Sequence, residues 1–274
     1  MTKAPWFTTL EFSVTGLCNR TCEFCPRADP SVYPNRNEHL ELGLYEKIVQ
    51  ELGSRGYASN VVYSGFGEPT LNKKLPTFIQ LTRQHCPDSF IEVKTDGDFL
   101  DVEKVTLLFE MGLSRLNVSV YDGPDHMDRF AEMRREAGID DQRFIMRGRF
   151  LPQSKNFGLI LSNRAGMVKP SIVPPLKEPL ERNCYYPFYI VMVDHKGDVL
   201  LCPHDWGKKL IVGNLHTMTL AEAWNSPVMH HVRERLSSKV RDFGPCDVCS
   251  VNGLLEGKEQ FEAWEQRRAA EERT

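Results

Sequence analysis

Three cysteines of the chain, Cys18, Cys22 and Cys25, fall within eight residues and form a CxxxCxxC pattern. Thiolates are soft ligands that select iron–sulfur clusters, zinc or copper(I). Three thiolates on one short loop can hold three corners of a cubane cluster and leave the fourth iron open to a substrate or cofactor. The alternatives are a zinc site completed by a distant fourth ligand, or three ordinary thiols. The spacing favours the cluster and leaves the decision to the rest of the chain.

A second group of four cysteines lies in the C-terminal half, at Cys184, Cys202, Cys246 and Cys249. Cys184 precedes an expected β-hairpin, whose strands Tyr189–Asp194 and Asp198–Cys202 flank a His-Lys-Gly turn. Four thiolates around a hairpin and a CxxC pair are typical of a zinc ribbon or of a second iron–sulfur site. Spacing alone slightly favours zinc, because four-thiolate zinc sites are so common.

The composition is ordinary for a globular protein, with 41% hydrophobic and 26% charged residues in a chain of 274. A net charge of −3 gives no reason to expect a nucleic-acid or membrane partner. The N-terminus lacks the apolar region of a signal peptide, and no apolar run approaches membrane-spanning length. We therefore expect a cytoplasmic protein whose eight cysteines are metal ligands more often than disulfides.

Short β-rich segments alternate with amphipathic ones from residue 9 to about 150, which predicts successive βαβ units around a parallel sheet. The expected strands are Leu10–Thr15, Asn60–Tyr63, Phe90–Lys94, Arg115–Val120 and Arg143–Phe150. The expected helices are Leu42–Leu52, Lys74–His85, Val102–Met111 and Asp125–Ala137. Ligands of such sheets gather at the C-terminal strand ends, and the first cysteine group directly follows the first strand. Cys86 lies at the opposite edge and is interpreted as a structural thiol.

Small and polar residues end the later strands at that same ligand-binding edge. The second strand ends in Gly65-Phe66-Gly67-Glu68, where two glycines permit close backbone approach and Glu68 supplies a carboxylate. Asp96 follows the third strand, and Ser119 lies at the end of the fourth. Arg143, Arg147 and Arg149 share one face of the fifth strand, where they need anionic partners unless that strand is an exposed edge.

The pattern changes after a proline-rich segment, Lys169–Pro179. Beyond the hairpin, Thr219 and Glu222 match a capping box that opens a short helix, and a second helix is expected at Pro227–Leu236. The last stretch, Leu254–Thr274, is expected to be a charged helix with Phe261 and Trp264 on a docking face.

Taken together, the CxxxCxxC loop, Phe24 before its last cysteine, and the Gly65–Glu68 strand end resemble the radical S-adenosylmethionine (SAM) superfamily over roughly residues 9–255. The resemblance implies an α/β fold: a partial (β/α)6 TIM-like barrel with a small C-terminal cluster domain built from a β-hairpin and helices. It implies a 4Fe–4S cluster on Cys18, Cys22 and Cys25, whose open iron binds the amino and carboxylate groups of SAM.

The same resemblance assigns roles around SAM residue by residue. Gly65, Gly67 and Glu68 would hold the methionine amino group, and Phe24 would border the adenine. Asp96 and Ser119 sit where ribose contacts occur, although the family more often has Asn at the position of Asp96. Arg147 or Arg149 would pair with the SAM carboxylate.

The C-terminal segment resembles the SPASM/twitch extension of this superfamily, in its shorter form with four cysteines. The resemblance shifts the assignment of Cys184, Cys202, Cys246 and Cys249 from zinc to an auxiliary 4Fe–4S cluster. The expected domains are a radical SAM barrel at 1–168, a linker at 169–180, the cluster domain at 181–255 and the charged helix at 256–274.

The reaction that the resemblance implies starts with reductive cleavage of SAM to methionine and a 5′-deoxyadenosyl radical, which abstracts hydrogen from the substrate. Loss of an electron to the auxiliary cluster would make the protein a dehydrogenase-like oxidoreductase, and Arg164, His204 and Asp205 are candidates for the base. We expect a small polar substrate such as an aminocyclitol or sugar, and an electron donor such as flavodoxin or ferredoxin. A carbohydrate epimerase, a peptide-modifying maturase and a zinc scaffold protein remain alternatives.

Overall fold

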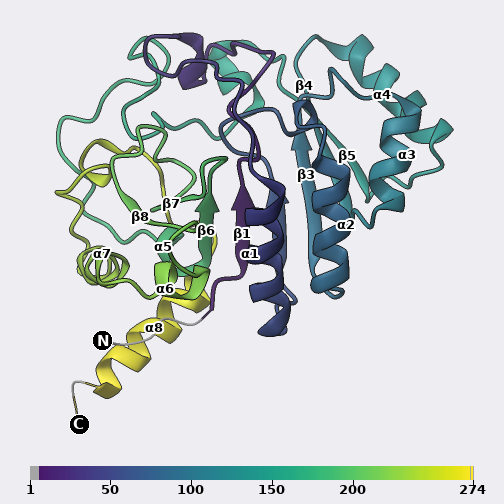
Figure 1. Cartoon of the computed structure of the whole chain (residues 1–274). Helices are drawn as coiled ribbons and strands as arrows, with labels where there is room; N and C mark the ends of the chain where they lie inside the picture. Colours follow the sequence, from purple (N-terminus) through teal and green to yellow (C-terminus); the bar gives the residue numbers. More distant parts are fainter. Residues whose placement is uncertain (1–5, 272, 274) are drawn as a thin grey trace. The chain divides into compact units, whose positions relative to one another are not determined.

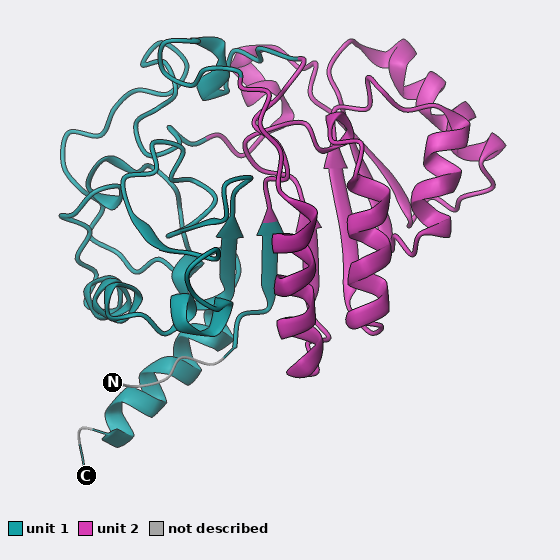
Figure 2. Cartoon of the chain, in the orientation of Figure 1, with its two compact units in different colours: residues 1–11, 20–35, 162–274 teal, residues 12–19, 36–161 magenta. Residues whose placement is uncertain are grey.

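The computed structural model describes residues 6–271 and residue 273. The chain divides into two compact units, shown in different colours in Figure 2. Unit 1 consists of residues 1–11, 20–35 and 162–274, and unit 2 of residues 12–19 and 36–161. The expected division into domains at residues 168 and 180 stays a prediction, because the units are interleaved in the sequence.

Unit 2 is a parallel sheet with helices along one face (Figure 1). Its strands are β2 (Asn60–Tyr63), β3 (Phe90–Thr95), β4 (Arg115–Val120) and β5 (Phe144–Gly148), in the order β5-β4-β3-β2. The helices are α1 (Leu42–Ser54), α2 (Leu75–His85), α3 (Val102–Glu110) and α4 (Pro124–Glu136). The last residue of β1 (Thr9–Phe12) joins this sheet, since Ser64 N donates to Phe12 O at 3.0 Å.

The alternation of side chains along β4 explains why the two faces of this sheet differ. Leu116, Val118 and Val120 are buried, and Val118 approaches Phe130 of α4 around Gly97. The intervening positions Arg115 and Ser119 are half-buried on the opposite face. Successive strand residues point to opposite faces, so the apolar set lies under the helices and the polar set faces away from them.

The expected strand–helix alternation is confirmed with small shifts of the boundaries. Beyond β5, the described chain continues into the 3-10 helix Gln153–Gly158 rather than into another strand–helix unit. The expected α/β class is confirmed.

Unit 1 contains the C-terminal strands and most of β1. Its strands β6 (Ile190–Val193), β7 (Asp198–Leu200) and β8 (Ile211–Asn214) follow β1 in the order β1-β6-β7-β8, with antiparallel β6-β7 and β7-β8 pairs. The helices are α5 (Tyr186–Tyr189), α6 (Leu220–Trp224), α7 (Pro227–Ser237) and α8 (Lys258–Glu271). The expected hairpin is confirmed as β6-β7, and β8 is a strand that the sequence analysis did not include.

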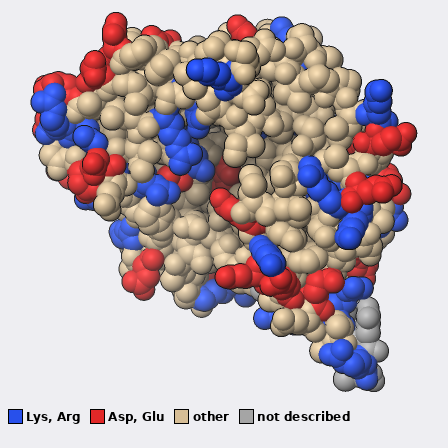
Figure 3. All heavy atoms as spheres, turned by 180° about the vertical axis from the view of Figure 1, so that it is seen from behind, with Lys and Arg blue, Asp and Glu red and all other residues tan. Residues whose placement is uncertain are grey.

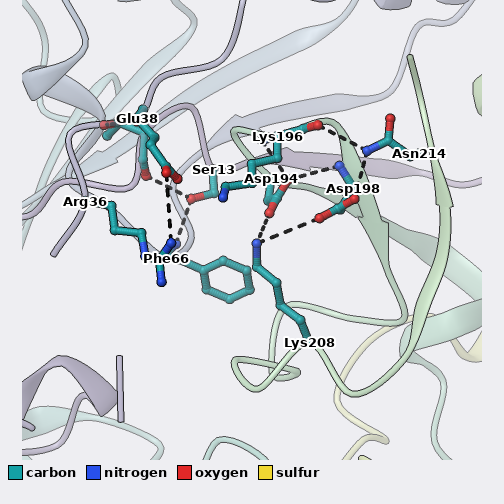
Figure 4. A network of polar contacts seen from close by, with 10 residues as sticks. Ser13, Arg36, Glu38, Phe66, Asp194, Lys196, Asp198, Lys208 and Asn214 are labelled. Carbon is teal, nitrogen blue, oxygen red and sulfur yellow. Dashed lines mark hydrogen bonds and ion pairs between the residues drawn. The ribbon is translucent and has the colours of Figure 1, made fainter. Parts of the chain in front are cut away.

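A buried aspartate organises the turn of this hairpin. Asp194 Oδ1 accepts hydrogen bonds from Lys196 N at 2.8 Å and Asp198 N at 3.0 Å, while its Oδ2 pairs with Lys208 (Figure 4). Gly197 has a φ of +77°, a conformation that favours glycine. The turn is therefore fixed by side-chain hydrogen bonds as well as by its glycine.

Two of the expected helix features are confirmed. Thr219 and Glu222 form the capping box at the start of α6. Trp264 of α8 is fully buried, and its ring lies 5.3 Å from that of Phe188, so the expected docking face of the last helix is confirmed. The helix begins at Lys258, and residues 272 and 274 of the expected range lie outside the described residues.

Basic and acidic side chains both occur over the face shown in Figure 3. In the described part of the chain, no helix combines the length and the apolar character needed to cross a bilayer.

Candidate active site

The first cysteine of the loop is fixed in unit 2 by the backbone of the Gly65–Glu68 segment. Glu68 N donates to Leu17 O at 2.7 Å, one residue before Cys18. A Cβ atom added to Gly67 would lie 2.2 Å from Thr15 O and 2.6 Å from Leu17 O. No side chain fits there, so the glycine allows the end of β2 to pack against the start of the cysteine loop.

The other two cysteines of the loop lie in unit 1, on a tight turn. Cys25 N donates to Cys22 O at 2.9 Å, and Cys25 precedes the 3-10 helix Pro26–Ala28. The buried Arg27 side chain donates to Asn35 Oδ1 at 3.0 Å and stabilises this turn. Burial raises the pKa of the Cys25 thiol, while the Arg27 backbone N–H and the Arg164 guanidinium partly offset the rise. All three loop cysteines are half-buried and form no disulfide, so their sulfurs can serve as cluster ligands.

The Glu68 carboxylate is buried and engaged by donors of unit 2 itself. Oε1 accepts from Thr70 N at 2.9 Å and from the hydroxyls of Thr70 and Thr95 at 2.6 Å each. Oε2 accepts from Asp96 N at 2.9 Å. Burial raises the pKa of Glu68, and these hydrogen bonds oppose the rise. Glu68 thus ties the end of β2 to the end of β3, and its contact with the SAM amino group stays a prediction.

Asp96 lies at the buried end of β3, on a turn that also reaches the cysteine loop. Asp96 Oδ1 accepts from Asp98 N at 3.0 Å. Asp98 Oδ2 in turn accepts from the side-chain amide of Asn19, the residue after Cys18, at 2.5 Å. Hydrogen bonds within unit 2 therefore link Glu68 and Asp96 to Leu17 and Asn19, the two neighbours of Cys18 in the sequence. The sequence analysis missed the pair Asn19–Asp98, because nothing in the local pattern joins residues so far apart.

The remaining residues assigned to SAM lie on β4 and on the strand at the end of the order, β5. Ser119 is half-buried and lies opposite Arg147 in the register, whose side chain is exposed. Arg149 N donates to Val120 O at 2.6 Å, and the Arg149 guanidinium donates to the carbonyl of Gly158. Burial lowers the pKa of Arg149. The described contacts of β5 fit the exposed-edge alternative, and neither arginine is singled out for the SAM carboxylate.

A buried ion pair on the polar face of unit 2 also escaped the sequence analysis. Glu92 on β3 is 5% exposed and accepts from Arg115 Nε on β4 at 2.7 Å, with Lys94 Nζ at 3.6 Å. Glu92 and Arg115 are partners in the strand register. Glu92 is thus an anionic partner for a strand arginine, but its arginine is Arg115 on β4 and not one of the arginines on β5 for which such a partner was expected.

The four later cysteines line one pocket in unit 1. Tyr186, Leu201, Leu236 and Val251 complete most of the apolar wall of this pocket. Burial raises the pKa of each of the four thiols. Four thiols that line one apolar pocket supply the ligand set that an iron–sulfur cluster requires.

A short segment of unit 1, residues 163–166, clamps the Cys246–Cys249 loop. Asn163 Nδ2 donates to Val248 O at 2.6 Å, and Asn163 Oδ1 accepts from Ser250 N at 3.0 Å. Asn163 N also donates to Ser250 Oγ at 2.8 Å. The backbone of Ala165 also opposes the rise that burial causes in the pKa of Cys249. The Asn163 side chain therefore holds the last cysteine loop by bonding to its backbone, as a neighbouring strand would.

The three candidate bases of unit 1 have different surroundings. Arg164 Nη1 lies 3.1 Å from His204 Nδ1. Because arginine can only donate, Nδ1 is the acceptor of this hydrogen bond. The neutral imidazole ring therefore carries its proton on Nε2. Burial, followed by the charge of Arg164, holds the pKa of His204 well below its usual range. Asp205 is fully buried, and its oxygens accept from Lys209 N at 3.0 Å and Leu210 N at 2.9 Å. Arg164 and His204 form a pair, while Asp205 holds a turn.

Two remaining residues complete the description of the predicted site. Phe24 is half-buried between Cys22 and Cys25 in unit 1, and its contact with adenine stays a prediction. Cys86 is 1% exposed in unit 2, and burial raises its pKa to about 11. Its burial agrees with the interpretation as a structural thiol.

Comparison with protein families gives two matches that together cover most of the chain. The family model of the radical SAM superfamily matches residues 12–146, and that of the SPASM iron–sulfur cluster-binding domain matches residues 184–250. The chain is 28% identical over 260 residues to the S-adenosyl-L-methionine-dependent 2-deoxy-scyllo-inosamine dehydrogenase of Niallia circulans, covering 93% of this chain and 97% of that protein. It is also 34% identical over 116 residues to the GTP 3′,8-cyclase of Aquifex aeolicus (strain VF5), but this covers only 41% of this chain and 34% of the cyclase.

Solved structures support the same fold. The crystal structure of BtrN in complex with AdoMet and 2-DOIA matches with a TM-score of 0.77 and 24% identity, over 93% of this chain and 97% of that one. Native anSMEcpe with bound AdoMet and Cp18Cys peptide matches with a TM-score of 0.58 and 15% identity, over 97% of this chain and 99% of that one. The expected fold class, a partial barrel with a C-terminal cluster domain, is confirmed.

Proposed function

Because the chain belongs to the radical SAM superfamily, we propose that it is a SAM-dependent dehydrogenase that oxidises a hydroxyl-bearing carbon of an aminocyclitol or a similar small polar substrate. One observation carries the proposal: the match to a dehydrogenase of this chemistry extends over 97% of that protein and includes the four-cysteine pocket. The cyclase of Aquifex aeolicus matches only 41% of this chain and 34% of its own length, so it supports the cofactor and not the reaction.

Cys18, Cys22 and Cys25 would hold a cluster that supplies the electron for cleavage of SAM, and the four later cysteines would hold a cluster that supplies an acceptor for the electron left on the substrate. In net terms, SAM and the alcohol would become methionine, 5′-deoxyadenosine, the ketone and one proton. The electron used for cleavage would be recovered when the substrate is oxidised, so no further oxidant would be required.

Two of the residues proposed for SAM, Glu68 and Asp96, belong to the hydrogen-bonded set of unit 2 that reaches the neighbours of Cys18, which supports the proposal. Cys18, Cys22 and Cys25 are proposed as ligands of the first cluster, with Phe24 at the adenine. Gly65, Gly67, Glu68, Asp96 and Ser119 are proposed to surround SAM, with Arg147 or Arg149 for its carboxylate. The Glu68 carboxylate accepts a hydrogen bond from Asp96 N. This bond supports a role of Glu68 in positioning Asp96 as much as a direct contact of Glu68 with SAM.

Arg164 and His204 are proposed to act on the substrate hydroxyl. Arginine stays protonated in proteins, so Arg164 can donate hydrogen bonds to the hydroxyl oxygen and favour loss of its proton. His204 is neutral, and its Nδ1 lone pair is directed at Arg164. His204 can therefore orient the Arg164 guanidinium, or it can receive the substrate proton once Arg164 turns to the substrate. The engaged carboxylate of Asp205 supports a structural role.

Two further assignments belong to this proposal. A low-potential donor such as flavodoxin or ferredoxin would supply the electron for SAM cleavage. The cytoplasm is the proposed location, because seven cysteines that must stay available as thiolates suit a reducing compartment.

The test is an anaerobic assay of the reconstituted protein with SAM, dithionite and 2-deoxy-scyllo-inosamine as the probe. We expect one 5′-deoxyadenosine per ketone formed, both measured by mass spectrometry. Cys22→Ala should lose both products. Cys202→Ala should still form 5′-deoxyadenosine and lose the ketone, while the matched cysteine variant Cys86→Ala should keep both.

Other outcomes would replace the proposal. Solvent deuterium at an inverted carbon, without ketone, would establish an epimerase. Ketone formation by Cys202→Ala at the rate of the unmodified protein would show that the auxiliary site does not accept the electron. A colourless protein that contains zinc and no iron or sulfide after anaerobic purification would point to the scaffold alternative.

A further inference from the structure

A buried arginine in unit 1 joins the two chain segments that carry the outer cysteines of the auxiliary pocket. Arg241 is 2% exposed and lines that pocket. Its Nε donates to Arg182 O at 3.0 Å and its Nη2 to Asn183 O at 2.6 Å, just before Cys184. On the other side, Nη1 donates to Val251 O at 3.1 Å and Nη2 to Asn252 O at 3.3 Å, just after Cys249.

Among residues 6–271 and 273, no carboxylate pairs with this buried guanidinium. In the part of the chain that the structure describes, its hydrogen bonds all go to backbone carbonyls. Carbonyl dipoles satisfy its N–H groups but do not neutralise the charge, and a buried charge without a counter-ion is strongly unfavourable. What distinguishes Arg241 is its position: it lines the pocket of the four cysteines, so its positive charge lies next to any group that these thiols bind.

The cysteines of the pocket supply that counter-charge. A Cβ added to Gly253 would lie 2.7 Å from Cys184 Sγ and 2.8 Å from Arg241 Nη2, so the sulfur and the guanidinium face the same small space. Arg241 also opposes the rise that burial causes in the pKa of Cys184, Cys246 and Cys249. One fixed cation therefore acts on three of the four thiols.

We propose that Arg241 sets the reduction potential of the auxiliary cluster, making it a better electron acceptor than the same pocket without the cation. Reduction adds one negative charge to the cluster, and in a pocket of low polarity a nearby fixed cation stabilises that charge. Net charge and surrounding groups are known determinants of cluster potential. The inference rests on the proposed function only in giving the cluster the role of electron acceptor.

The experiment is a redox titration of the auxiliary cluster followed by electron paramagnetic resonance. The full-length chain carries Cys18→Ala, Cys22→Ala and Cys25→Ala together, so that the signal comes from the auxiliary site. In this background, Arg241→Gln removes the charge and Arg241→Lys keeps it. Arg233→Gln is the matched control, because Arg233 is 1% exposed, donates to the carbonyls of Pro187 and Trp224, and lies outside the lining of the pocket.

We expect Arg241→Gln to lower the midpoint potential by an amount that changes the electron-transfer equilibrium at least tenfold, which is about 59 mV for a one-electron couple. Arg241→Lys should keep most of the potential, and Arg233→Gln should leave it unchanged. An unmoved potential in Arg241→Gln, or an equal shift in Arg233→Gln, would overturn the proposal.

A second variant decides the matter if Arg241→Gln does not retain the cluster. Arg182→Gln removes a weaker, half-buried cation that also lowers the pKa of Cys184, and it should shift the potential in the same direction by a smaller amount. An unchanged potential would then overturn the proposal. The titration uses neither SAM nor substrate. An unchanged potential would therefore not contradict the proposed dehydrogenase activity, and a protein that forms no ketone could still have its cluster potential measured.

Discussion

Replacing Gly67 with alanine tests whether close backbone packing at the end of β2 builds the start of the cysteine loop. The added methyl group would meet Thr15 O at 2.2 Å and Leu17 O at 2.6 Å. Both atoms belong to the backbone, so neither can move aside by a change of rotamer. The loop segment must therefore shift as a whole, and the 2.7 Å hydrogen bond from Glu68 N to Leu17 O is lost or stretched.

The size of the effect follows from these two changes. Overpacking costs about 1–3 kcal/mol, and the lost hydrogen bond adds about 1 kcal/mol. A chain of this length loses roughly 2–4 °C in melting temperature per kcal/mol. We expect a decrease of roughly 5–15 °C for Gly67→Ala, together with displacement of Cys18 and loss of the first cluster.

The assay combines thermal unfolding of the apo protein with iron analysis after anaerobic reconstitution. Two 4Fe–4S clusters correspond to about eight iron atoms per chain, and Gly67→Ala should retain about four with SAM binding abolished. Gly43→Ala is the control, because a Cβ added there in α1 meets nothing within 4 Å. If Gly67→Ala melts, binds iron and binds SAM as Gly43→Ala does, the packing argument is wrong.

Three further predictions concern single residues. Asn163→Ala removes two side-chain hydrogen bonds to the Cys246–Cys249 loop, so the auxiliary iron should exchange faster with a chelator and stability should fall by about 1–3 kcal/mol. Cys86 keeps its proton in the folded state up to a pKa of about 11, against an ordinary value of 9.0. The unfolded chain therefore loses that proton first, stability falls as the pH rises from about 9 to about 11, and urea titrations should show a smaller fall in Cys86→Ala. Arg164→Gly should keep the stability of the apo protein within about 1 kcal/mol and should abolish ketone formation, whereas unchanged ketone formation would exclude the proposed role of Arg164.

The elements and the position of the cysteine loop could be predicted because they depend on local pattern. Alternating and helical periodicities predicted β2 and β4 with the observed boundaries and most other elements within a few residues. The strand β8 was missed because its short sequence, Ile211–Asn214, ends in Gly-Asn and reads as a turn. Its pairing with β7 is a tertiary feature that overrides local preference.

Partners distant in the sequence could not be predicted in the same way. The pattern predicted a carboxylate at Glu68 but not that Thr95 and Asp96 would occupy its oxygens. Likewise, Arg241 is one of many basic residues in the sequence, and only burial and four carbonyl partners distinguish it. Both depend on chain segments that meet after folding.

The backbone around Arg164 separates what this segment does for stability from what it does for chemistry. Arg164 and Ala165 have φ values of 47° and 53°, a left-handed conformation that costs a residue other than glycine about 1–3 kcal/mol. The hydrogen bonds of Asn163 to Val248 and Ser250 hold the segment in this conformation. Glycine at position 164 would satisfy the same backbone with less strain. The strain is therefore accepted for the sake of the arginine side chain. Its guanidinium lies 3.1 Å from His204 Nδ1, and its charge lowers the pKa of both Cys25 and Cys249.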